Sequence, residues 1–341
     1  FCHVMVNSIS DLRPPPRLAT STSHFTLHDT AQTMSSPVVA WHERFLLWTF
    51  LCIVARGLVL ASEESERHAA VVRPTFLGAN WKCNLDTIGQ VDDHVDALNA
   101  MWCSLDPSEA GAVELCVHPP FVFLDRVRER LHKDIGVGSQ NALDARGPDR
   151  SNTGATTMKM IREVGCEWVL LGHSDRRNNL GESNKLIASK VQAALEAGLG
   201  VCLTIGEKRS QRNWGLALAT LRKQLAAAAR VIPRDAWKNV VCAYEPVWAV
   251  GEGATPCSPE EAQRVNAALR GWIRENVGDD AADACRLTYT GSVNEENAAD
   301  YAALPDVDGF VVGRAGLDTT KLRSIIHTLT SSSTGHSCPT Q

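Results

Sequence analysis

Four polar residues of this chain, each at or just after the end of a short apolar run, could together move a proton. They are Asn80, Lys82, His173 and Glu245. A carboxylate can act as a general base, a histidine or an amide can donate a hydrogen bond to an oxyanion, and a lysine supplies a fixed positive charge. Taken singly, the lysine would be a solvated loop residue, the histidine a structural one and the carboxylate a strand terminus. In combination, they indicate abstraction of a proton beside a carbonyl group.

A second group of residues belongs to turns that expose backbone N–H groups. Gly251 follows Glu245 closely, Ser292 follows a glycine, and Gly313 stands directly before Arg314. Backbone donors at such turns can bind an oxyanion or a phosphate group. Each glycine could also serve only its turn, so a phosphate site requires the chain to bring these turns together.

Eight apolar, β-branched runs, each followed by an amphipathic stretch, must position these residues. The predicted strands are 75–80, 113–117, 135–140, 168–172, 200–205, 239–244, 286–290 and 308–312. The predicted helices are 85–102, 121–132, 156–164, 184–197, 210–230, 259–275, 295–303 and 319–329. Eight such units in about 255 residues match a closed parallel (β/α)₈ barrel, whose active site lies at the C-terminal ends of the strands. We therefore expect the polar residues and the turns to meet at one rim.

An open, doubly wound sheet is the alternative arrangement for the same alternation of strands and helices. It would usually carry a glycine-rich nucleotide-binding turn after the first strand. That place holds Gly78-Ala79-Asn80-Trp81-Lys82 instead, which favours the barrel.

The composition excludes some classes of partner. The net charge is −5 and no basic stripe with interleaved aromatic residues is present, so nucleic acid is not an expected partner. The eleven cysteines form no C-x-x-C pair, and several lie in apolar runs, where a thiol acts as a small hydrophobic group. This pattern favours free thiols and a reducing compartment.

The first part of the chain differs from the barrel in composition. Residues 1–72 form a predicted N-terminal extension, residues 73–331 the catalytic barrel, and residues 332–341 a disordered tail. The start of the extension is rich in Ser, Thr and Pro and is typical of disorder, whereas the apolar segment 45–61 resembles a secretory signal peptide that would start at Met34. A signal anchor, the first part of a plastid address, or an error in the gene prediction would also explain this segment.

Six segments of the barrel resemble the triosephosphate isomerase family in their order and spacing. They are Gly78–Lys82, Gly172–Arg177, Ile205–Lys208, Tyr244–Ala249, Tyr289–Val293 and Gly309–Gly313. The resemblance implies a TIM barrel that interconverts dihydroxyacetone phosphate and glyceraldehyde 3-phosphate, a step of glycolysis and gluconeogenesis. It also implies that the reaction needs neither a metal nor an organic cofactor.

The resemblance further implies a role for each residue of the first group. Glu245 is the base, His173 and Asn80 donate hydrogen bonds to the substrate oxygens, and Lys82 supplies positive charge. The histidine of the family acts as a neutral imidazole at the N-terminus of a helix, which here would begin at Ser174.

The remaining implied roles concern the lid, the phosphate and a second subunit. The loop from Pro246 to Thr255 is the expected lid, and the phosphate is expected at the backbone N–H groups of the second group of residues: Gly251, Ser292, Gly313 and Arg314. Ser174 and Asp175 are expected to support the site. The third loop, Ala142 to Gly154, is expected to carry Thr153 into the site of a second subunit, which makes the protein a homodimer.

Five positions depart from the pattern of the family. Asp175 replaces a glutamate, Thr204 a cysteine, Glu252 a threonine of the lid, Arg314 a glycine and Ala155 a glutamate. The shorter Asp175 is expected to make a looser contact on the Lys82 side of the site. Arg314 would be strained if its backbone had the positive φ that glycine tolerates, and its side chain would either obstruct the phosphate or add a cation.

Two alternative functions and two locations remain open at this point. The departures at Asp175, Glu252 and Arg314 motivate a catalytically weakened barrel that acts as a binding or scaffold protein. Another phosphosugar isomerase or an aldolase-like enzyme is less well supported, because no lysine for a Schiff base stands on the sixth strand. The family resemblance implies the cytoplasm, whereas the signal-like segment 34–61 would send the chain to an organelle by the secretory route or to a plastid. No stable membrane association of the barrel is expected.

Overall fold

Eight parallel strands form the centre of the molecule. The computed structural model describes residues 73–143, 152–251 and 254–334, and in this part of the chain the strands close into a barrel in the order of the sequence, β1 to β8. The strands are β1 (Thr75–Asn80), β2 (Val113–His118), β3 (Gly136–Ser139), β4 (Trp168–Leu171), β5 (Gly200–Ile205), β6 (Val240–Tyr244), β7 (Arg286–Tyr289) and β8 (Gly309–Val312). The barrel predicted from the sequence is confirmed.

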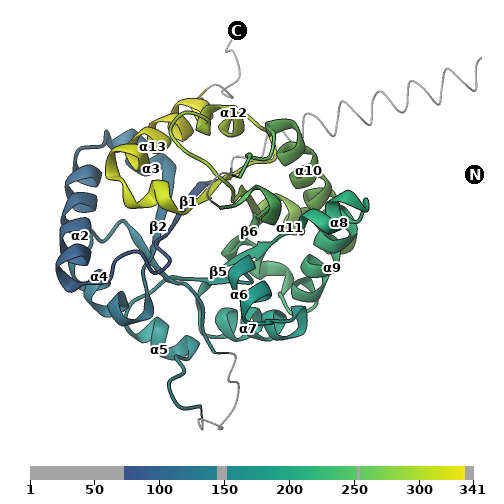
Figure 1. Cartoon of the computed structure of the whole chain (residues 1–341), viewed down its shortest axis with the longest axis horizontal. Coiled ribbons are helices and arrows are strands. Elements are labelled where there is room, and N and C mark those ends of the chain that lie inside the picture. The colour runs from purple at the N-terminus through teal and green to yellow at the C-terminus, as the bar shows by residue number, and fades with distance from the viewer. Residues whose placement is uncertain (1–72, 144–151, 252–253, 335–341) are drawn as a thin grey trace, which may run out of the picture. The chain divides into compact units, whose positions relative to one another are not determined.

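Helices surround this barrel, as Figure 1 shows. The α-helices are α2 (Ile88–Cys103), α3 (Pro107–Ala112), α4 (Leu124–Arg130), α5 (Met158–Glu163), α6 (Ser174–Asn179), α7 (Asn184–Glu196), α8 (Arg209–Asn213), α9 (Ala217–Ala229), α10 (Pro259–Asn276), α11 (Asp279–Ala284), α12 (Ala298–Ala302) and α13 (Thr319–Thr334). The 3₁₀ helices are η1 (Phe121–Phe123), η2 (Arg234–Asn239), η3 (Val247–Ala249) and η4 (Arg314–Leu317).

Two of the predicted helices are wrong as single elements. The prediction over 210–230 corresponds to α8 and α9, which are separated at Gly215, where φ is +69°. The prediction over 121–132 corresponds to η1 followed by α4. In both places the apolar pattern continues across the break, so hydrophobic periodicity alone cannot reveal it.

The alternation of side chains along each strand directs one set of residues into the barrel. Phe76 on β1 and Val241 and Ala243 on β6 belong to the buried cluster of the interior, whereas Leu77 and Ala79 belong to the layer between strands and helices. Since successive side chains of a strand point to opposite faces, Asn80 at the end of β1 and Glu245 just after β6 continue the inward set. The strand period therefore directs both polar residues toward the C-terminal mouth of the barrel.

Candidate active site

Glu245 is held at the barrel mouth by donors from the loop after β4. Its carboxylate is 1% exposed. One oxygen, Oε2, accepts the backbone N–H of Ser174 at 2.8 Å, and Oε1 accepts the Ser174 hydroxyl at 2.8 Å. His173 Nε2 lies 3.2 Å from Oε1. These donors hold the carboxylate in a fixed position.

His173 is oriented by the helix that it caps. It is the N-cap residue of α6, and its Nδ1 accepts the backbone N–H of Asp175 at 3.1 Å. Because a backbone N–H always carries its hydrogen, Nδ1 must supply the lone pair, although the Asp175 carboxylate also lies 3.4 Å away. The geometry therefore favours the neutral ring with its proton on Nε2, facing Glu245.

Two glycines permit the close approaches behind these residues. Gly172 has φ +78°, and a Cβ there would lie 2.8 Å from the carbonyl oxygen of Thr204. Gly206 packs against the backbone of Glu245, because a Cβ added at Gly206 would lie 1.9 Å from the Glu245 carbonyl oxygen. Side chains at either position would push the loops after β4 and β5 away from the base, so both glycines are needed for packing.

Lys82 and Asn80 line the same cavity as Glu245. The Lys82 backbone N–H donates to Asn80 Oδ1 at 3.0 Å, which leaves the amide N–H₂ of Asn80 for another acceptor. Lys82 has φ +51° and is the only residue other than glycine with a positive φ in the described part of the chain. Its carbonyl oxygen accepts the Gln140 side chain at 2.7 Å. The strained backbone is thus fixed by neighbours on β1 and the loop after β3, as is common at functional sites.

Asp175 makes an ordinary contact with Lys82 despite its shorter side chain. The Lys82 Nζ donates to Asp175 Oδ2 at 3.1 Å. The contact therefore has the length of an ordinary ion pair.

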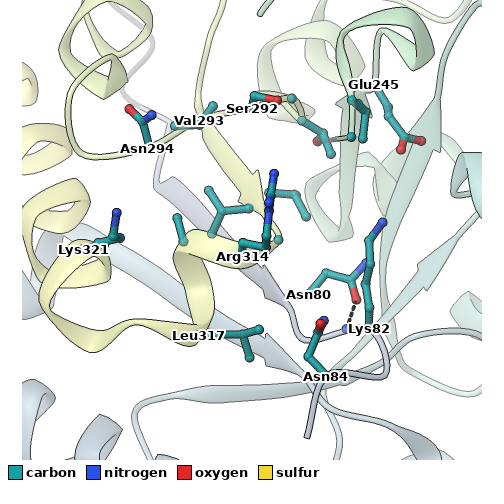
Figure 2. A pocket seen from close by; sticks show the side chains of 18 of the residues that line it. Asn80, Lys82, Asn84, Glu245, Ser292, Val293, Asn294, Arg314, Leu317 and Lys321 are labelled. Carbon is teal, nitrogen blue, oxygen red and sulfur yellow. Dashed lines mark hydrogen bonds between the residues drawn. The ribbon is translucent and has the colours of Figure 1, made fainter. Parts of the chain in front are cut away.

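These side chains line one cavity of about 790 Å³ at the barrel mouth. Eight of the residues singled out from the sequence lie in its wall: Asn80, Lys82, His173, Glu245, Gly251, Ser292, Gly313 and Arg314. Ser174 and Asp175 lie behind this wall and support it through the hydrogen bonds above. Figure 2 shows Lys82 and Glu245 on one side of the cavity and Arg314 nearer its centre.

Thr153 is the one expected site residue that lies apart. It is exposed, and residues 152–157 extend outward near α5 (Figure 1). Three residues that were not expected from the sequence also line the cavity: Asn84, Asn294 and Lys321. No motif marked them, because they depend on how the loops after β1, β7 and β8 come together.

Arg314 has no backbone strain. It begins η4, and its φ is not positive, so the strain considered from the sequence does not occur. Its side chain is exposed to the cavity. Glu252 in the expected lid, the other charged departure from the family pattern, lies outside the described residues.

The base of the loop expected to be the lid is anchored on a buried carboxylate. Glu207 is fully buried and accepts hydrogen bonds from the Trp248 indole at 2.7 Å and the Tyr244 hydroxyl at 3.1 Å. Burial raises the pKa of Glu207, and the two donors act against this shift. Ser292 adds a second anchor, because its hydroxyl donates to the Ala249 carbonyl at 3.1 Å.

Behind the base, Arg177 joins β4 to β5. It donates to the carbonyl oxygens of Gly172 at 2.5 Å and Thr204 at 3.1 Å. Burial lowers the pKa of Arg177 to about 10, so the guanidinium stays charged at neutral pH. Thr204 is fully buried, as expected for a packing position, and its hydroxyl has no partner in the described residues.

In the ranges that the structure describes, no group of three or more His, Cys, Asp or Glu side chains is placed to hold a metal ion. No helix in those ranges is both long enough and apolar enough to cross a membrane.

Comparison with known proteins gives a consistent result over the whole barrel. Residues 75–329 match the model of the family described as triosephosphate isomerase. The chain is 40% identical to the chloroplastic triosephosphate isomerase of Arabidopsis thaliana over 75% of its own length and 78% of that protein. It is 42% identical to the cytosolic enzyme of Stellaria longipes, over 76% of its own length and 97% of that protein. For the enzyme of Neurospora crassa, the identity is 41% over 72% and 95% of the two chains.

Proposed function

The chain belongs to the triosephosphate isomerase family, and on that premise we propose that the cavity at the barrel mouth is its active site. At this site the protein interconverts dihydroxyacetone phosphate and glyceraldehyde 3-phosphate by moving a proton between two adjacent carbons through an enediolate. The observation that carries this proposal is the meeting of Asn80, Lys82, His173 and Glu245 around one cavity.

Glu245 removes the proton from the carbon beside the carbonyl group. The electron pair of the broken C–H bond forms the C=C bond of the enediolate, and the carbonyl oxygen takes up the negative charge. The protonated Glu245 then returns the proton to the neighbouring carbon. The hydroxyl proton passes from one oxygen of the enediolate to the other, so that a new carbonyl forms on the first carbon and a hydroxyl on the second. A buried carboxylate without bulk water around it suits both transfers, because water would exchange the proton and solvate the base.

His173 and Asn80 stabilise the oxygens on which charge develops. The amide N–H₂ of Asn80 is the donor left by the bond from Lys82 to Asn80 Oδ1. The Nε2–H of His173 faces Glu245 at 3.2 Å and turns to the substrate oxygen when Glu245 moves to the substrate carbon. Lys82 adds a fixed positive charge. Donors that are already oriented before the reaction stabilise an oxyanion most effectively.

Substrate binding must release Glu245 from its contacts with Ser174. These contacts occupy both carboxylate oxygens, so the base cannot face a substrate carbon while all of them remain. The loop that begins at Pro246 acts as the lid, and its closure supplies the movement. The phosphate binds to the N–H groups near Gly251, Ser292, Gly313 and Arg314.

The working unit is a homodimer formed by the loops after the first four strands. Large apolar side chains in these units are exposed: Ile88, Phe121, Val122, Met160 and Leu180. Exposed apolar groups on consecutive units are typical of a surface that a partner covers. Thr153 then reaches the Asn80 and Lys82 side of the second subunit. Sedimentation of the full chain should give a dimer, and a monomer at micromolar concentration would contradict this proposal.

The enzyme serves glycolysis and gluconeogenesis in the cytoplasm, with an organelle as the alternative location. Segment 34–61, which motivates the alternative, lies outside the described residues. Relatives named cytosolic and relatives named chloroplastic are both similar to this chain. A reporter fused to residues 34–62 distinguishes the two, because diffuse signal in the cytosol would count against targeting.

The decisive experiment for the activity is a coupled isomerase assay with Glu245→Gln. The amide is nearly the same size but cannot accept the proton, so we expect kcat to fall by about 10²- to 10⁴-fold. Glu245→Asp retains a carboxylate in a shifted position, so its kcat should lie between those of the wild type and Glu245→Gln. Wild-type turnover that Glu245→Gln leaves unchanged would rule out Glu245 as the base.

A further inference from the structure

Arg314 is a cation in the cavity wall without a partner in the described residues. The wall holds two other long cations, Lys82 and Lys321. Lys82 pairs with Asp175 at 3.1 Å, and Lys321 pairs with Glu295 at 2.7 Å. The Arg314 side chain forms no hydrogen bond or ion pair within the described ranges, and Figure 2 shows it standing between Lys321 and Lys82.

The carboxylates of the same wall already accept hydrogen bonds from other groups. Glu245 accepts its bonds from Ser174 on both oxygens. Asp318 caps the start of α13, because its Oδ1 accepts the backbone N–H groups of Thr320 and Lys321 at 2.9 and 3.2 Å. The guanidinium of Arg314 is therefore left for an anion that enters the cavity.

The backbone around Arg314 explains how a large side chain fits here. The residue begins η4 next to Gly313, and an added Cβ at Gly313 would meet nothing within 4 Å, so the surroundings are open. The phosphate is expected at this same turn. A guanidinium is planar, always charged, and able to donate two parallel hydrogen bonds to a phosphate.

We propose that the Arg314 side chain is a specificity-determining residue that binds the phosphate of the substrate directly and makes affinity depend on its charge. This inference rests on the proposed isomerase function. The backbone amides of the turn recognise an oxyanion by geometry, whereas the guanidinium adds recognition of the full negative charge. The second ionisation of a phosphate monoester has a pKa of about 6, so the contribution of Arg314 grows as the phosphate becomes a dianion above that pH.

The test is steady-state kinetics of the full-length protein with Arg314→Gln, Arg314→Lys and Arg314→Gly. We expect Arg314→Gln to raise KM by about 10- to 100-fold, as for loss of a hydrogen-bonded charge, with kcat changed by less than about threefold. Arg314→Lys should recover part of the affinity, since it retains the charge without the fork. Inhibition by inorganic phosphate should weaken in parallel, and the salt dependence of KM should become shallower.

Lys321→Gln provides the matched control, because this lysine lines the same cavity but is paired with Glu295. It should change KM by less than about threefold. A lower KM in Arg314→Gly would overturn the inference and show that the arginine obstructs the site. A KM in Arg314→Gln equal to that of the wild type would also overturn it. Both outcomes leave Glu245→Gln as the separate test of the isomerase function.

Discussion

The two ends of the barrel hold ion pairs of opposite character. At the N-terminal end of the strands, Arg270 is 1% exposed and pairs with Asp306 at 2.6 Å and with Asp308 at 2.7 Å. At the C-terminal end, the side chains of Lys82 and Asp175 are 37% and 56% exposed and form one contact of 3.1 Å. The first set fixes the fold, whereas the second leaves its charge accessible to a substrate.

The buried set is also saturated with hydrogen bonds. Arg270 donates to the carbonyl oxygens of Ala282 and Cys285, and Asp308 accepts the backbone N–H of Leu287. Burial opposes the charge of Arg270, but the two aspartates outweigh it and raise the pKa of its guanidinium. A charge that no substrate needs can be enclosed completely in this way. A charge that must meet a substrate has to retain an open side.

The largest loss of stability is expected for Arg270→Met, at the N-terminal end of the barrel. Removal of the guanidinium leaves buried Asp306 without its cation and Asp308 with Arg73 alone, so we expect a loss of about 3–5 kcal/mol in the free energy of unfolding. Urea denaturation measures it. Below the unfolding transition, kcat should stay close to that of the wild type. Arg274→Ala on the same helix, which removes a partly exposed arginine, should cost less than about 1 kcal/mol.

A second test uses pH at the active-site end of the barrel. Burial lowers the pKa of His118 to about 4, and its Nδ1 has no partner in the described residues. The unfolded chain, with a histidine pKa of about 6.5, then binds more protons than the folded protein in this interval. The contribution of His118 is therefore fully present above pH about 6.5 and is lost as the pH falls toward 4.

Urea titrations between these pH values should show a decline on the order of 2–3 kcal/mol from this residue. His118→Gln should flatten the profile. A wild-type profile that is level over the interval would show that folding does not lower the pKa of His118.

The smallest expected effect belongs to Asp175→Asn. An exposed ion pair contributes about 0–1 kcal/mol to stability, so urea denaturation should detect little change. If Asp175→Asn lost as much stability as Arg270→Met, the ion pairs at the two ends of the barrel would not differ in their contribution to the fold. A change in KM without a change in stability would sharpen it, because Lys82 would then have lost a partner that matters only for the substrate.

Much of the active site could be predicted from the sequence because the barrel converts strand order into proximity. Asn80 and Glu245 lie more than 160 residues apart in the chain. Each lies at or just after the C-terminal end of a strand, at a position that faces into the barrel. Alternation with a period of two and parallel closure then bring them to the same mouth. His173 is different, since it departs from the alternation of β4 and reaches the cavity through the turn at Gly172.

Other features depend on distances that no pattern in the chain encodes. The ordinary length of the Lys82–Asp175 contact depends on where α6 begins, and the break between α8 and α9 depends on the turn at Gly215. The absence of strain at Arg314 depends on the 3₁₀ turn that it begins. The shorter side chain at Asp175 and the replacement of a glycine at Arg314 could not, by themselves, give the length of a contact or the backbone angle.

The sequence by itself thus determined the barrel, its family and the four residues at its mouth, because apolar periodicity and motif order are properties of the chain. Only the tertiary structure decided which charges are paired and which are free. Pairing depends on contacts of about 3 Å between segments that are distant in sequence, and a shift of one turn of backbone is enough to make or break such a contact. Arg314 is an example. The sequence gives its residue type, but only the structure shows that Lys82 and Lys321 are paired and that Arg314 is an unpaired cation of the cavity within the described residues.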